Sequence, residues 1–316
     1  MLPAGAAGAR EAQLDLVHRE GHRTGHAKAG RGGAVFARPV PWLSWRSHVV
    51  RIDSAAMAAI LVDIEGVLHV SGEPIPGAME AIAELRRQGH RLRFVTNNTT
   101  LSRAMLAEEL RSYGIELDDS ELQTTAAAAA RALAGKRVFA LVIAALVEDL
   151  EGIEFVGEGA EAVLLGGADE TDETGRVFSY MNLARAFAEL ELGADLYCLH
   201  KNKWWQTSRG PLLDSGAFVA GLEYAAGVEA TVLGKPSLAY FEAALAALDA
   251  EPALTWMVGD DLESDIAGAQ RYGLKTVLVR TGKFRPDQLE RSTVVPDAVI
   301  SSIAYLPEWL EQEHLT

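Results

Sequence analysis

The sequence is poor in cysteine, in long apolar runs and in positive charge, and each scarcity excludes a class of protein. Cys198 is the single cysteine among 316 residues, so no disulfide can form within the chain, which fits a reducing compartment such as the cytoplasm. No apolar run reaches the roughly 18 residues of a membrane span. The longest, residues 138–147, has charged residues on both sides, and we expect a buried strand there, a helix start, or both. The net charge of −15 argues against general affinity for nucleic acid, so neither nucleic acid nor membrane is an expected partner.

Residues 1–56 differ from the rest of the chain in charge and in pattern. They hold eight Lys and Arg against four Asp and Glu, a net charge of +4, so the remaining residues carry −19. No hydrophobic period runs through them, and a transit peptide would fit their arginines but not Glu11, Asp15 and Glu20. We therefore interpret residues 1–56 as a disordered leader or as sequence upstream of a misassigned start, with Met57 opening the folded chain.

From Met57 onward, short apolar runs alternate with amphipathic segments. Apolar residues make up 49% of the chain, enough for a substantial core, and the length allows two modest domains. The alternation predicts strands and helices in turn, which favours a doubly wound α/β sheet. Strands are expected at 58–62, 92–95, 137–142, 162–165, 196–199, 255–258, 276–279 and 298–300, and helices at 78–88, 102–113, 180–190, 215–226 and 238–248.

Polar side chains follow three of these strands. The first strand runs into Asp63 and Glu65, two carboxylates two residues apart, and then into a glycine. In open α/β sheets the reactive groups lie beyond the C-terminal ends of the strands, so both carboxylates are candidates for chemistry. A strand that simply ends in an acidic turn is the alternative, and this cluster alone does not decide between the two.

The second cluster, residues 96–99, reads Thr-Asn-Asn-Thr and also follows an apolar strand. Its hydroxyl, amide and backbone N–H groups can hold phosphoryl oxygens without adding charge. An ordinary helix N-cap explains the same residue types, and taken alone it is the better interpretation.

The third cluster is split between two places in the chain. Lys235 stands between a glycine and a proline just before a helix, and Asp260, Asp261 and Asp265 follow the strand at 255–258. Carboxylate oxygens suit Mg²⁺, which takes one or two of them together with water and substrate phosphate. A solvated turn and a helix cap are the alternatives for the lysine and the aspartates. Each alternative is reasonable singly, but the occurrence of all three clusters in this order favours a metal and phosphate site.

With these residues identified, the sequence resembles the haloacid dehalogenase superfamily from Met57 to about Leu310. The four motifs of that superfamily appear in order at 63–67 (DIEGV), 95–98 (VTNN), 234–236 (GKP) and 259–261 (GDD) with Asp265. Within it, the chain resembles subfamily IIA, whose members have a large cap, and the phospholysine phosphohistidine inorganic pyrophosphate phosphatase branch in particular. The narrower resemblance rests on residues 66–69, 74–78, 93–97, 199–201, 218–219, 222–224 and 232–236.

The resemblance implies a Rossmann-like core built from residues 57–126 and 232–316, with an α/β cap inserted at 127–231 that closes over the site. It also implies a Mg²⁺-dependent phosphohydrolase acting on a small phosphorylated substrate, with Asp63 as the nucleophile that forms an aspartyl phosphate.

The resemblance further implies the roles of the remaining residues. The substrate phosphate would be held by Thr96, Asn97 and Lys235. Mg²⁺ would be bound by the side chains of Asp63 and Asp260 and by the backbone carbonyl of Glu65, with Asp261 and Asp265 orienting the groups around the ion.

Glu65 departs from the superfamily pattern, which usually has aspartate two residues after the nucleophile as the general acid/base. Glutamate keeps the carboxyl but moves it by roughly 1.5 Å, comparable to one helical rise. General acid/base catalysis is worth about 10²–10⁴-fold, so a misplaced carboxyl would lower turnover. The alternative function is therefore a catalytically weak binding or scaffold protein with the same fold. Dehalogenation is disfavoured because it needs no Mg²⁺ site.

Several residues of the expected cap are candidates for substrate contact. Lys201 and Asn202 end a cap strand and could face the substrate, while His69 is expected to be a loop residue near the site. Trp204 and Trp205 could cover the ligand, but cap core or a dimer contact is the better interpretation, so a homodimer through the cap is kept open. Asp214, Ser215 and Gly216 form either a helix cap or a substrate loop.

Overall fold

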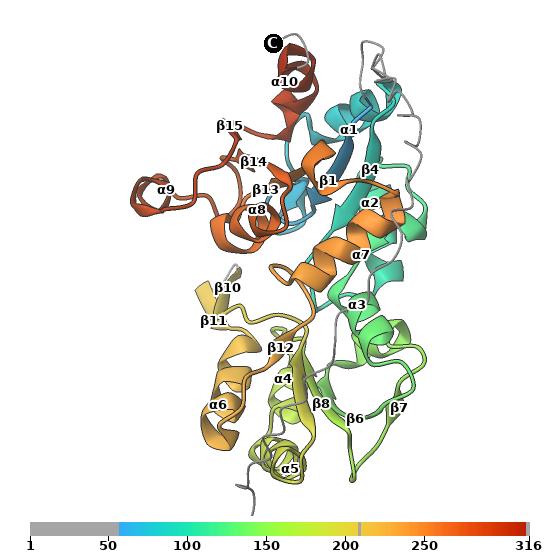
Figure 1. Ribbon diagram of the computed structural model, residues 1–316, viewed down its shortest axis with the longest axis vertical. Coiled ribbons are helices and arrows are strands. Elements are labelled where there is room, and N and C mark those ends of the chain that lie inside the picture. The colour runs from blue at the N-terminus through green and yellow to red at the C-terminus, as the bar shows by residue number, and fades with distance from the viewer. Residues whose placement is uncertain (1–56, 208–209, 314–316) are drawn as a thin grey trace, which may run out of the picture. The chain divides into compact units, whose positions relative to one another are not determined.

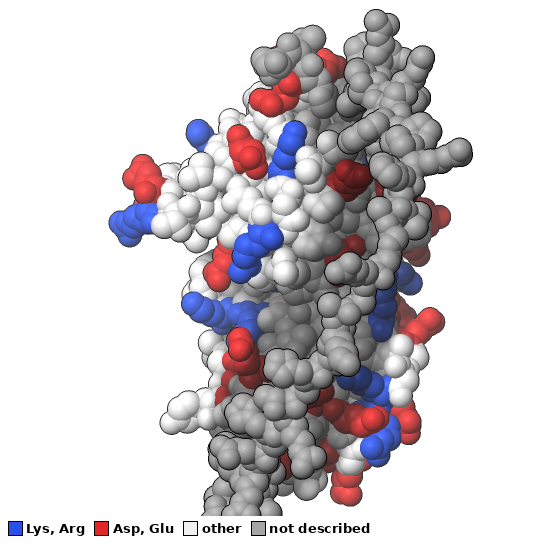
Figure 2. All heavy atoms as spheres, in the orientation of Figure 1, with Lys and Arg blue, Asp and Glu red and all other residues white. Residues whose placement is uncertain are grey.

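The structure, a computed structural model, describes residues 57–207 and 210–313 (Figure 1). The leader expected at residues 1–56 lies outside the described residues. Within the part of the chain that the structure describes, no helix has the length and apolar character to cross a membrane. Figure 2 shows Lys and Arg interspersed with Asp and Glu over the described residues of the face in view.

A six-stranded parallel sheet contains the strands that lead into three of the four motifs, those at 63–67, 95–98 and 259–261. Its order is β15-β14-β13-β1-β4-β5, so β1 lies in the interior. On one side it pairs with β4, which follows it closely in the sequence, and on the other with β13, which comes from the last third of the chain. The crevice beyond the strand ends at such a switch point is where α/β sheets bind ligands. The strands are β1 (Ala59–Asp63), β4 (Arg91–Val95), β5 (Leu122–Gln123), β13 (Thr255–Gly259), β14 (Lys275–Val279) and β15 (Ala298–Ile300).

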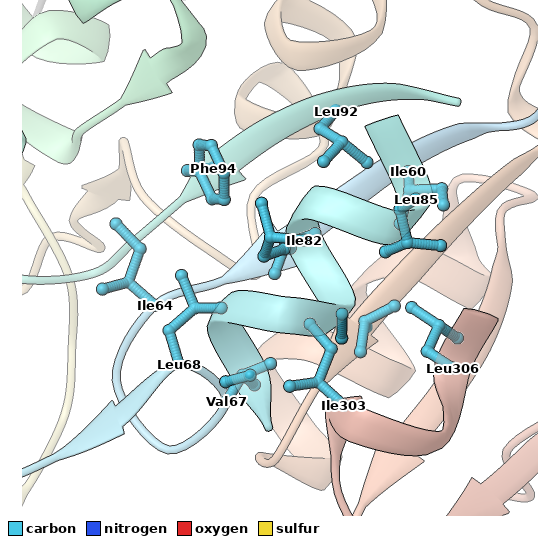
Figure 3. Packing of buried hydrophobic residues seen from close by; sticks show 14 of the residues in the cluster. Ile60, Ile64, Val67, Leu68, Ile82, Leu85, Leu92, Phe94, Ile303 and Leu306 are labelled. Atoms are coloured by element: carbon cyan, nitrogen blue, oxygen red, sulfur yellow. The ribbon is translucent and has the colours of Figure 1, made fainter. Parts of the chain in front are cut away.

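Alternating residues of β1 enter two different hydrophobic cores because successive side chains of a strand point to opposite faces. Ile60 and Val62 pack into a core that includes Leu85 and Leu306 (Figure 3), whereas Leu61 packs with Phe241 on the other face. Burial on both faces explains why the strand is a continuous apolar run. The first core contains residues of α1 (Ala78–Arg87), α2 (Arg103–Ser112) and α10 (Leu306–Glu313), and the second contains residues of α7 (Leu238–Leu248) and α8 (Gly268–Arg271).

A second parallel sheet, ordered β12-β9-β8-β6-β7, is inserted in the chain between β5 and β13. The expected α/β class, a doubly wound parallel sheet with an inserted α/β cap, is thereby confirmed. The segment at residues 138–147 is both a strand and a helix start, since β6 is followed by a 3₁₀ helix at Ala144–Asp149. The strands are β6 (Arg137–Val142), β7 (Glu154–Phe155), β8 (Ala162–Gly166), β9 (Asp195–Cys198) and β12 (Thr231–Val232), and the helices of this part are α3 (Thr125–Ala132), α4 (Asp172–Val177), α5 (Tyr180–Glu191) and α6 (Gly216–Ala226).

Two antiparallel hairpins were not expected from the sequence. One joins β2 (His69–Val70) to β3 (Glu73–Pro74) just after the first motif, within a stretch expected as loop. The other joins β10 (Trp204–Thr207) to β11 (Gly210–Leu213) and pairs Trp204 with Leu213, both exposed. Trp204 and Trp205, for which cap core or a dimer contact was preferred over a place above the ligand, therefore lie on a strand of a separate two-stranded sheet.

Candidate active site

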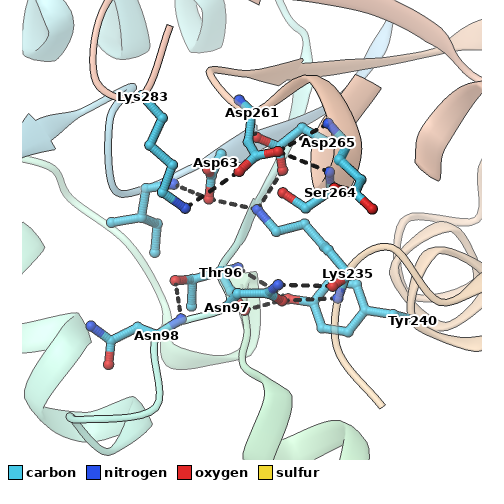
Figure 4. Close-up of polar contacts among 12 residues, drawn as sticks. Asp63, Thr96, Asn97, Asn98, Lys235, Tyr240, Asp261, Ser264, Asp265 and Lys283 are labelled. Carbon is cyan, nitrogen blue, oxygen red and sulfur yellow. Dashed lines mark hydrogen bonds and ion pairs between the residues drawn. The ribbon is translucent and has the colours of Figure 1, made fainter. Parts of the chain in front are cut away.

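Asp63 ends β1 and is the buried carboxylate around which the other polar groups gather (Figure 4). Its Oδ1 accepts the backbone N–H of Ile64 at 2.8 Å and lies 2.7 Å from Nζ of Lys235. Burial raises the pKa of Asp63, and the attraction of Lys235 only partly opposes that rise. No hydrogen bond reaches Asp63 Oδ2 from the described residues, so this oxygen is left for a further ligand.

Lys235 is the buried cation of the site. Its Nζ lies 2.7 Å from Oδ1 of Asp63 and 2.7 Å from Oδ1 of Asp265, and its side chain is almost fully enclosed. Burial alone would lower the pKa of Lys235, but Asp265 and Asp63 together raise it above its ordinary value. The ammonium is therefore permanently charged and fixes two carboxylates with short ion pairs.

Asn97 holds the backbone of Lys235 from across the sheet. Its Nδ2 donates to the Lys235 carbonyl at 2.8 Å, and its Oδ1 accepts the Lys235 N–H at 2.8 Å. The neighbouring Gly234 cannot carry a side chain, because a Cβ there would lie 2.7 Å from Asn97 Oδ1. The resemblance implied that Asn97 contacts the substrate phosphate; in the structure its amide, two residues after the end of β4, is engaged with the Lys235 backbone, and the phosphate contact stays a prediction.

Thr96 is buried immediately after β4. Its Oγ1 accepts the backbone N–H of Asn98 at 2.9 Å, and no acceptor for its hydroxyl hydrogen is found among the described residues. Its backbone N–H donates to the Tyr240 hydroxyl at 3.0 Å, and that hydroxyl lies 2.6 Å from the carbonyl of Gln123. The tyrosine thereby ties β4, β5 and α7 together and leaves the Thr96 hydroxyl free to donate.

Three aspartates follow β13 and have different partners. Asp260 Oδ2 accepts the backbone N–H of Lys283 at 2.6 Å, whereas its Oδ1 is buried with no hydrogen-bond partner among the described residues. Asp261 Oδ1 accepts the N–H groups that open a π-helical turn at Leu262–Ala267, at 2.9 and 3.0 Å. Asp265 is fully buried and accepts the Asp261 N–H through Oδ2 at 3.1 Å.

The environment separates the pKa values of these aspartates. Burial raises the pKa of Asp260 to about 7, with repulsion from Asp265 adding to it. Burial also raises the pKa of Asp265, and repulsion from the Asp63 carboxylate adds to that rise. Burial also acts on Asp261, but Lys283 and the two N–H donors of the turn outweigh it and lower its pKa. The pKa of Asp265 stays raised even with Lys235 in contact, so a further cation nearby would favour ionisation of both Asp260 and Asp265.

The carboxylates fit a divalent metal ion. One oxygen from each of Asp63, Asp260 and Asp265 lies within 4.8 Å of the others. Asp265 Oδ1 forms an ion pair with Lys235 but no hydrogen bond of good geometry, and its Oδ2 accepts the Asp261 N–H. Asp63 Oδ2 and Asp260 Oδ1 have neither an ion pair nor a hydrogen bond among the described residues and are the two oxygens best left for an ion. Hard carboxylate oxygens are the ligands that Mg²⁺ prefers. When all are ionised, the four aspartates exceed the two lysines by two negative charges, which one divalent ion would neutralise.

Two glycines allow the loops to close around Asp260. A Cβ on Gly66 or on Gly282 would lie 2.0 Å from Asp260 Oδ2, and both residues have positive φ, 86° and 59°. Positive φ is strained for residues with side chains, so both the lack of space and the backbone conformation require glycine at each position. The hydroxyl of Thr281 donates to the Gly66 carbonyl, which joins the loops after β1 and β14.

Glu65 points into the β2–β3 hairpin. Its Oε1 accepts the Ser71 N–H at 3.0 Å and its Oε2 lies 3.3 Å from Nδ1 of His69. The side chain is 47% exposed, and its hydrogen-bonding partners among the described residues all belong to the hairpin. The sequence expected this carboxyl beside the nucleophile, but none of its contacts in the structure is with Asp63.

The cap candidates are engaged within the inserted part of the chain. Lys201 Nζ pairs with Glu223 of α6 at 2.9 Å, and the Asn202 carbonyl accepts the Gly216 N–H at 3.2 Å. Neither contact involves the carboxylate cluster, so substrate contact by Lys201 and Asn202 stays a prediction.

His200, in contrast, links the inserted part to the loop after β4. Its Nδ1 accepts the Asn202 N–H at 3.2 Å, so the neutral ring carries its hydrogen on Nε2, which donates to Thr99 Oγ1 at 3.0 Å. Burial lowers the pKa of His200, which keeps the ring neutral. Asp214 lies 3.6 Å from the same nitrogen.

Lys283 was not singled out in the sequence. It follows β14, the neighbour of β13, and its Nζ lies 3.5 Å from Oδ2 of Asp261. Its position could have identified it, because Thr281, Gly282 and Lys283 come just after β14, the strand beside the one that leads into Asp260 and Asp261.

Comparison with known proteins identifies the family. Residues 60–156 match a model described as haloacid dehalogenase-like hydrolase, and residues 232–306 match one described as HAD-hydrolase-like. The chain is 36% identical over 262 residues to haloacid dehalogenase-like hydrolase domain-containing protein 2 from Homo sapiens, covering 82% of this chain and 98% of that one. It is 35% identical over 267 residues to phospholysine phosphohistidine inorganic pyrophosphate phosphatase from Homo sapiens, covering 82% and 96%.

Solved structures agree with this assignment. A p-nitrophenyl phosphatase from Archaeoglobus fulgidus matches with a TM-score of 0.74 at 29% identity, covering 80% of this chain and 99% of that one. A glycerol phosphate phosphatase from Mycobacterium tuberculosis, solved in complex with magnesium, matches with a TM-score of 0.71 at 27% identity, covering 80% and 77%. The chain therefore belongs to the haloacid dehalogenase-like hydrolases, among the phosphatases of that family.

Proposed function

We propose that the chain is a Mg²⁺-dependent phosphohydrolase that acts through an aspartyl phosphate on Asp63. Its substrate is a small phosphorylated compound: a phosphomonoester, a phosphoamide or pyrophosphate. The observation that carries this proposal is the buried Asp63 carboxylate, held at 2.7 Å by Lys235, with an unpartnered oxygen of Asp260 beside it. The names of the similar proteins, which include a pyrophosphate phosphatase and a p-nitrophenyl phosphatase, support the substrate class.

The side chains present suit two successive displacements at phosphorus. Asp63 attacks phosphorus, a bond from its carboxylate oxygen to phosphorus forms, and the bond from phosphorus to the leaving group breaks. Water then attacks the aspartyl phosphate, which releases phosphate and restores the Asp63 carboxylate. The buried ammonium of Lys235 and the free hydroxyl hydrogen of Thr96 stabilise the charge that builds up on the phosphoryl oxygens.

The metal ligands proposed are the side chains of Asp63 and Asp260 and the backbone carbonyl of Glu65. When bound there, Mg²⁺ supplies positive charge to the phosphoryl oxygens and lowers the cost of keeping both carboxylates ionised. Asp265 acts through Lys235, which it holds at 2.7 Å, and Asp261 acts through the backbone turn that it caps. The magnesium complex of the similar glycerol phosphate phosphatase supports the choice of ion.

Glu65 is proposed as the general acid/base, and this role requires its carboxyl to leave the hairpin. The contacts to Ser71 and His69 that hold it lie at 3.0 and 3.3 Å, and the side chain is half-exposed, so a rotation costs little. The same contacts favour the second candidate function, a catalytically weak protein that binds phosphorylated ligands without turning them over.

Release of phosphate from p-nitrophenyl phosphate, with and without Mg²⁺, distinguishes the two functions. Wild type is expected to show Mg²⁺-dependent release, and Asp63→Asn is expected to lower the rate by at least about 10³-fold because an amide cannot act as this nucleophile. Asp195→Asn, at an exposed position that starts β9, is the matched control and should leave the rate unchanged.

A covalent readout completes the experiment. Acid quenching during turnover should trap one phosphoryl group on the peptide that contains Asp63, as detected by mass spectrometry. Turnover of more than a few per cent in Asp63→Asn would refute the nucleophile assignment, and Mg²⁺-independent binding without any turnover in wild type would favour the second candidate.

A further inference from the structure

The backbone of Lys283 is fixed to the floor of the site. Its N–H donates to Asp260 Oδ2 at 2.6 Å, and the preceding Gly282 is so close to Asp260 that a Cβ would overlap the carboxylate. Thr281 binds the Gly66 carbonyl from the same loop. The position of the Lys283 Cα relative to the proposed metal ligands is therefore set by three contacts and does not depend on its side chain.

The side chain of Lys283, unlike that of Lys235, is free to meet a ligand. Lys235 is 2% exposed and makes two ion pairs of 2.7 Å. Lys283 is 53% exposed, and among the described residues its ammonium has one polar partner, Asp261 Oδ2 at 3.5 Å, the outer limit of a hydrogen bond. An ammonium has three donors, so this loose pair leaves most of its capacity unused. Figure 4 shows the Lys283 and Lys235 side chains entering from opposite sides of Asp63.

Of the two lysines that contact the carboxylate cluster, Lys235 is buried and Lys283 is exposed. Asp63, Lys235 and Thr96 form the buried floor, and in phosphoryl transfer the leaving group lies roughly in line with the attacking oxygen, on the far side of phosphorus. It therefore points away from Asp63, toward the solvent-exposed part of the site, where Lys283 is the half-exposed cation.

Resting on the proposed function, we propose that Lys283 determines specificity by binding a second anionic group on the leaving-group side of the substrate. The preferred substrates then carry a further carboxylate or phosphoryl group beyond the phosphoryl group that is transferred. The carboxylate of Asp261 would repel such an anion. The Lys283 ammonium, 3.5 Å from that carboxylate, screens its charge and provides N–H donors for the anion. A neutral leaving group gains nothing from this contact, so Lys283 discriminates between substrates with an anionic leaving group and substrates with a neutral one.

Two aryl phosphates that differ by one charge test the proposal: phenyl phosphate and 4-carboxyphenyl phosphate. Lys283→Met removes the charge at nearly equal length, and Lys283→Arg keeps it. The matched control is Lys275→Met, at the start of β14, the strand that ends four residues before Lys283; its ammonium lies over the Trp256 ring at 4.9 Å. Values of kcat/KM are measured with Mg²⁺, and thermal midpoints verify that all variants are folded.

Lys283→Met is expected to lower kcat/KM for the carboxylated substrate roughly tenfold more than for phenyl phosphate, through loss of one charge-assisted contact. Lys283→Arg should retain most of the preference, and Lys275→Met all of it. Equal losses on both substrates would overturn the proposal, because Lys283 would then act only by supporting Asp260 and Asp261.

Affinities measured on an inactive variant test the role of Lys283 independently of whether the protein hydrolyses phosphate compounds. Calorimetric titration of Asp63→Asn, and of the same variant carrying Lys283→Met, compares the affinities of the two compounds. Absence of phosphate release by wild type would refute the proposed function. Equal affinities of the two compounds for Asp63→Asn would refute the role of Lys283, whereas a preference lost with Lys283→Met would support it.

Discussion

Replacement of Asn97 by alanine tests whether this residue binds phosphate or holds Lys235. The Asn97 side chain makes two hydrogen bonds of 2.8 Å, one to the backbone N–H of Lys235 and one to its carbonyl. We expect Asn97→Ala to lower both stability and turnover, since the loop that carries the buried ammonium loses its anchor to β4.

The size of the stability loss follows from the bonds removed. Each hydrogen bond contributes about 1 kcal/mol, and the buried backbone groups left unpaired add a desolvation cost, for a loss of about 2–3 kcal/mol. For a chain of this size, that loss lowers the thermal midpoint by roughly 5–10 °C. Turnover should fall by about 10²-fold, as expected when a catalytic group is displaced by about 1 Å.

Asn182→Ala is the matched control for stability. The Asn182 amide also makes two backbone hydrogen bonds, to the carbonyls of Arg176 and Val177 at 3.0 and 3.1 Å, but it lies on α5 in the inserted part of the chain. It should lower the midpoint with little change in kcat. If Asn97→Ala left the midpoint unchanged and raised only KM, Asn97 would be a direct phosphate ligand and the anchoring role would be wrong.

Three further predictions concern the carboxylates. Asp260→Ala should raise the Mg²⁺ concentration required for half-maximal activity by at least about tenfold, and an unchanged metal titration would place the ion elsewhere. In the absence of metal, the thermal midpoint should fall as the pH rises from about 5 to 8. The pKa of Asp260 and of Asp265 is raised to about 7 in the folded state, so the folded protein favours their protonated forms. Their contribution to stability is therefore present at low pH and is lost as they ionise. The gain in midpoint from Mg²⁺ should grow over the same range, and a rising metal-free midpoint would contradict the sign. Glu65→Gln should slow hydrolysis of an alkyl phosphate by about 10²-fold but affect an aryl phosphate less, with Glu65→Asp tolerated; equal, small effects on both substrates would leave Glu65 only its backbone carbonyl.

The strands that carry the site were predictable because each is buried on both faces. β1 and β13 are five-residue runs with every residue buried, and such runs stand out from the polar segments around them. Once the strands are located, the polar residues at their ends are located as well. This is why Asp63 and Asp260 could be located from the sequence, whereas Lys235 was found from its place between a glycine and a proline and from the order of the clusters. The structure brings Asp63 together with Lys235, Asp260 and Asp265.

The partners of Asn97 and Lys283 could not be predicted, because they depend on contacts between distant parts of the chain. Asn97 bonds to a residue 138 positions away, and an asparagine near a strand end has the same local preferences whether it caps, anchors or binds. Lys283 is one of seven lysines in the chain, and its neighbours in the sequence do not distinguish it. Only the adjacency of β13 and β14 places it beside Asp261.

The β2–β3 hairpin, by contrast, left a signal that could have been used. Ser71 and Gly72 separate its strands and have φ values of 51° and 82°. Positive φ at both residues of a two-residue connection is the geometry of a type I′ turn, and Ser-Gly is a turn dipeptide. Strands of two residues are too short to show alternation, so the turn was the only local sign of the hairpin that binds Glu65.

The distribution of partners among the acidic residues indicates where the metal requirement originates. Lys235 compensates Asp63 and Asp265 with 2.7 Å ion pairs, and Lys283 and two N–H donors stabilise Asp261. Asp260 has a backbone N–H on Oδ2 and no partner on Oδ1 among the described residues, and the glycines at 66 and 282 bring backbone so close that its position is fixed. A buried carboxylate oxygen kept immobile and without a hydrogen bond is costly unless a ligand supplies the missing charge. Asp260 is therefore a residue at which binding of a cation contributes to stability, because among the described residues it has no lysine ammonium in contact to supply that charge.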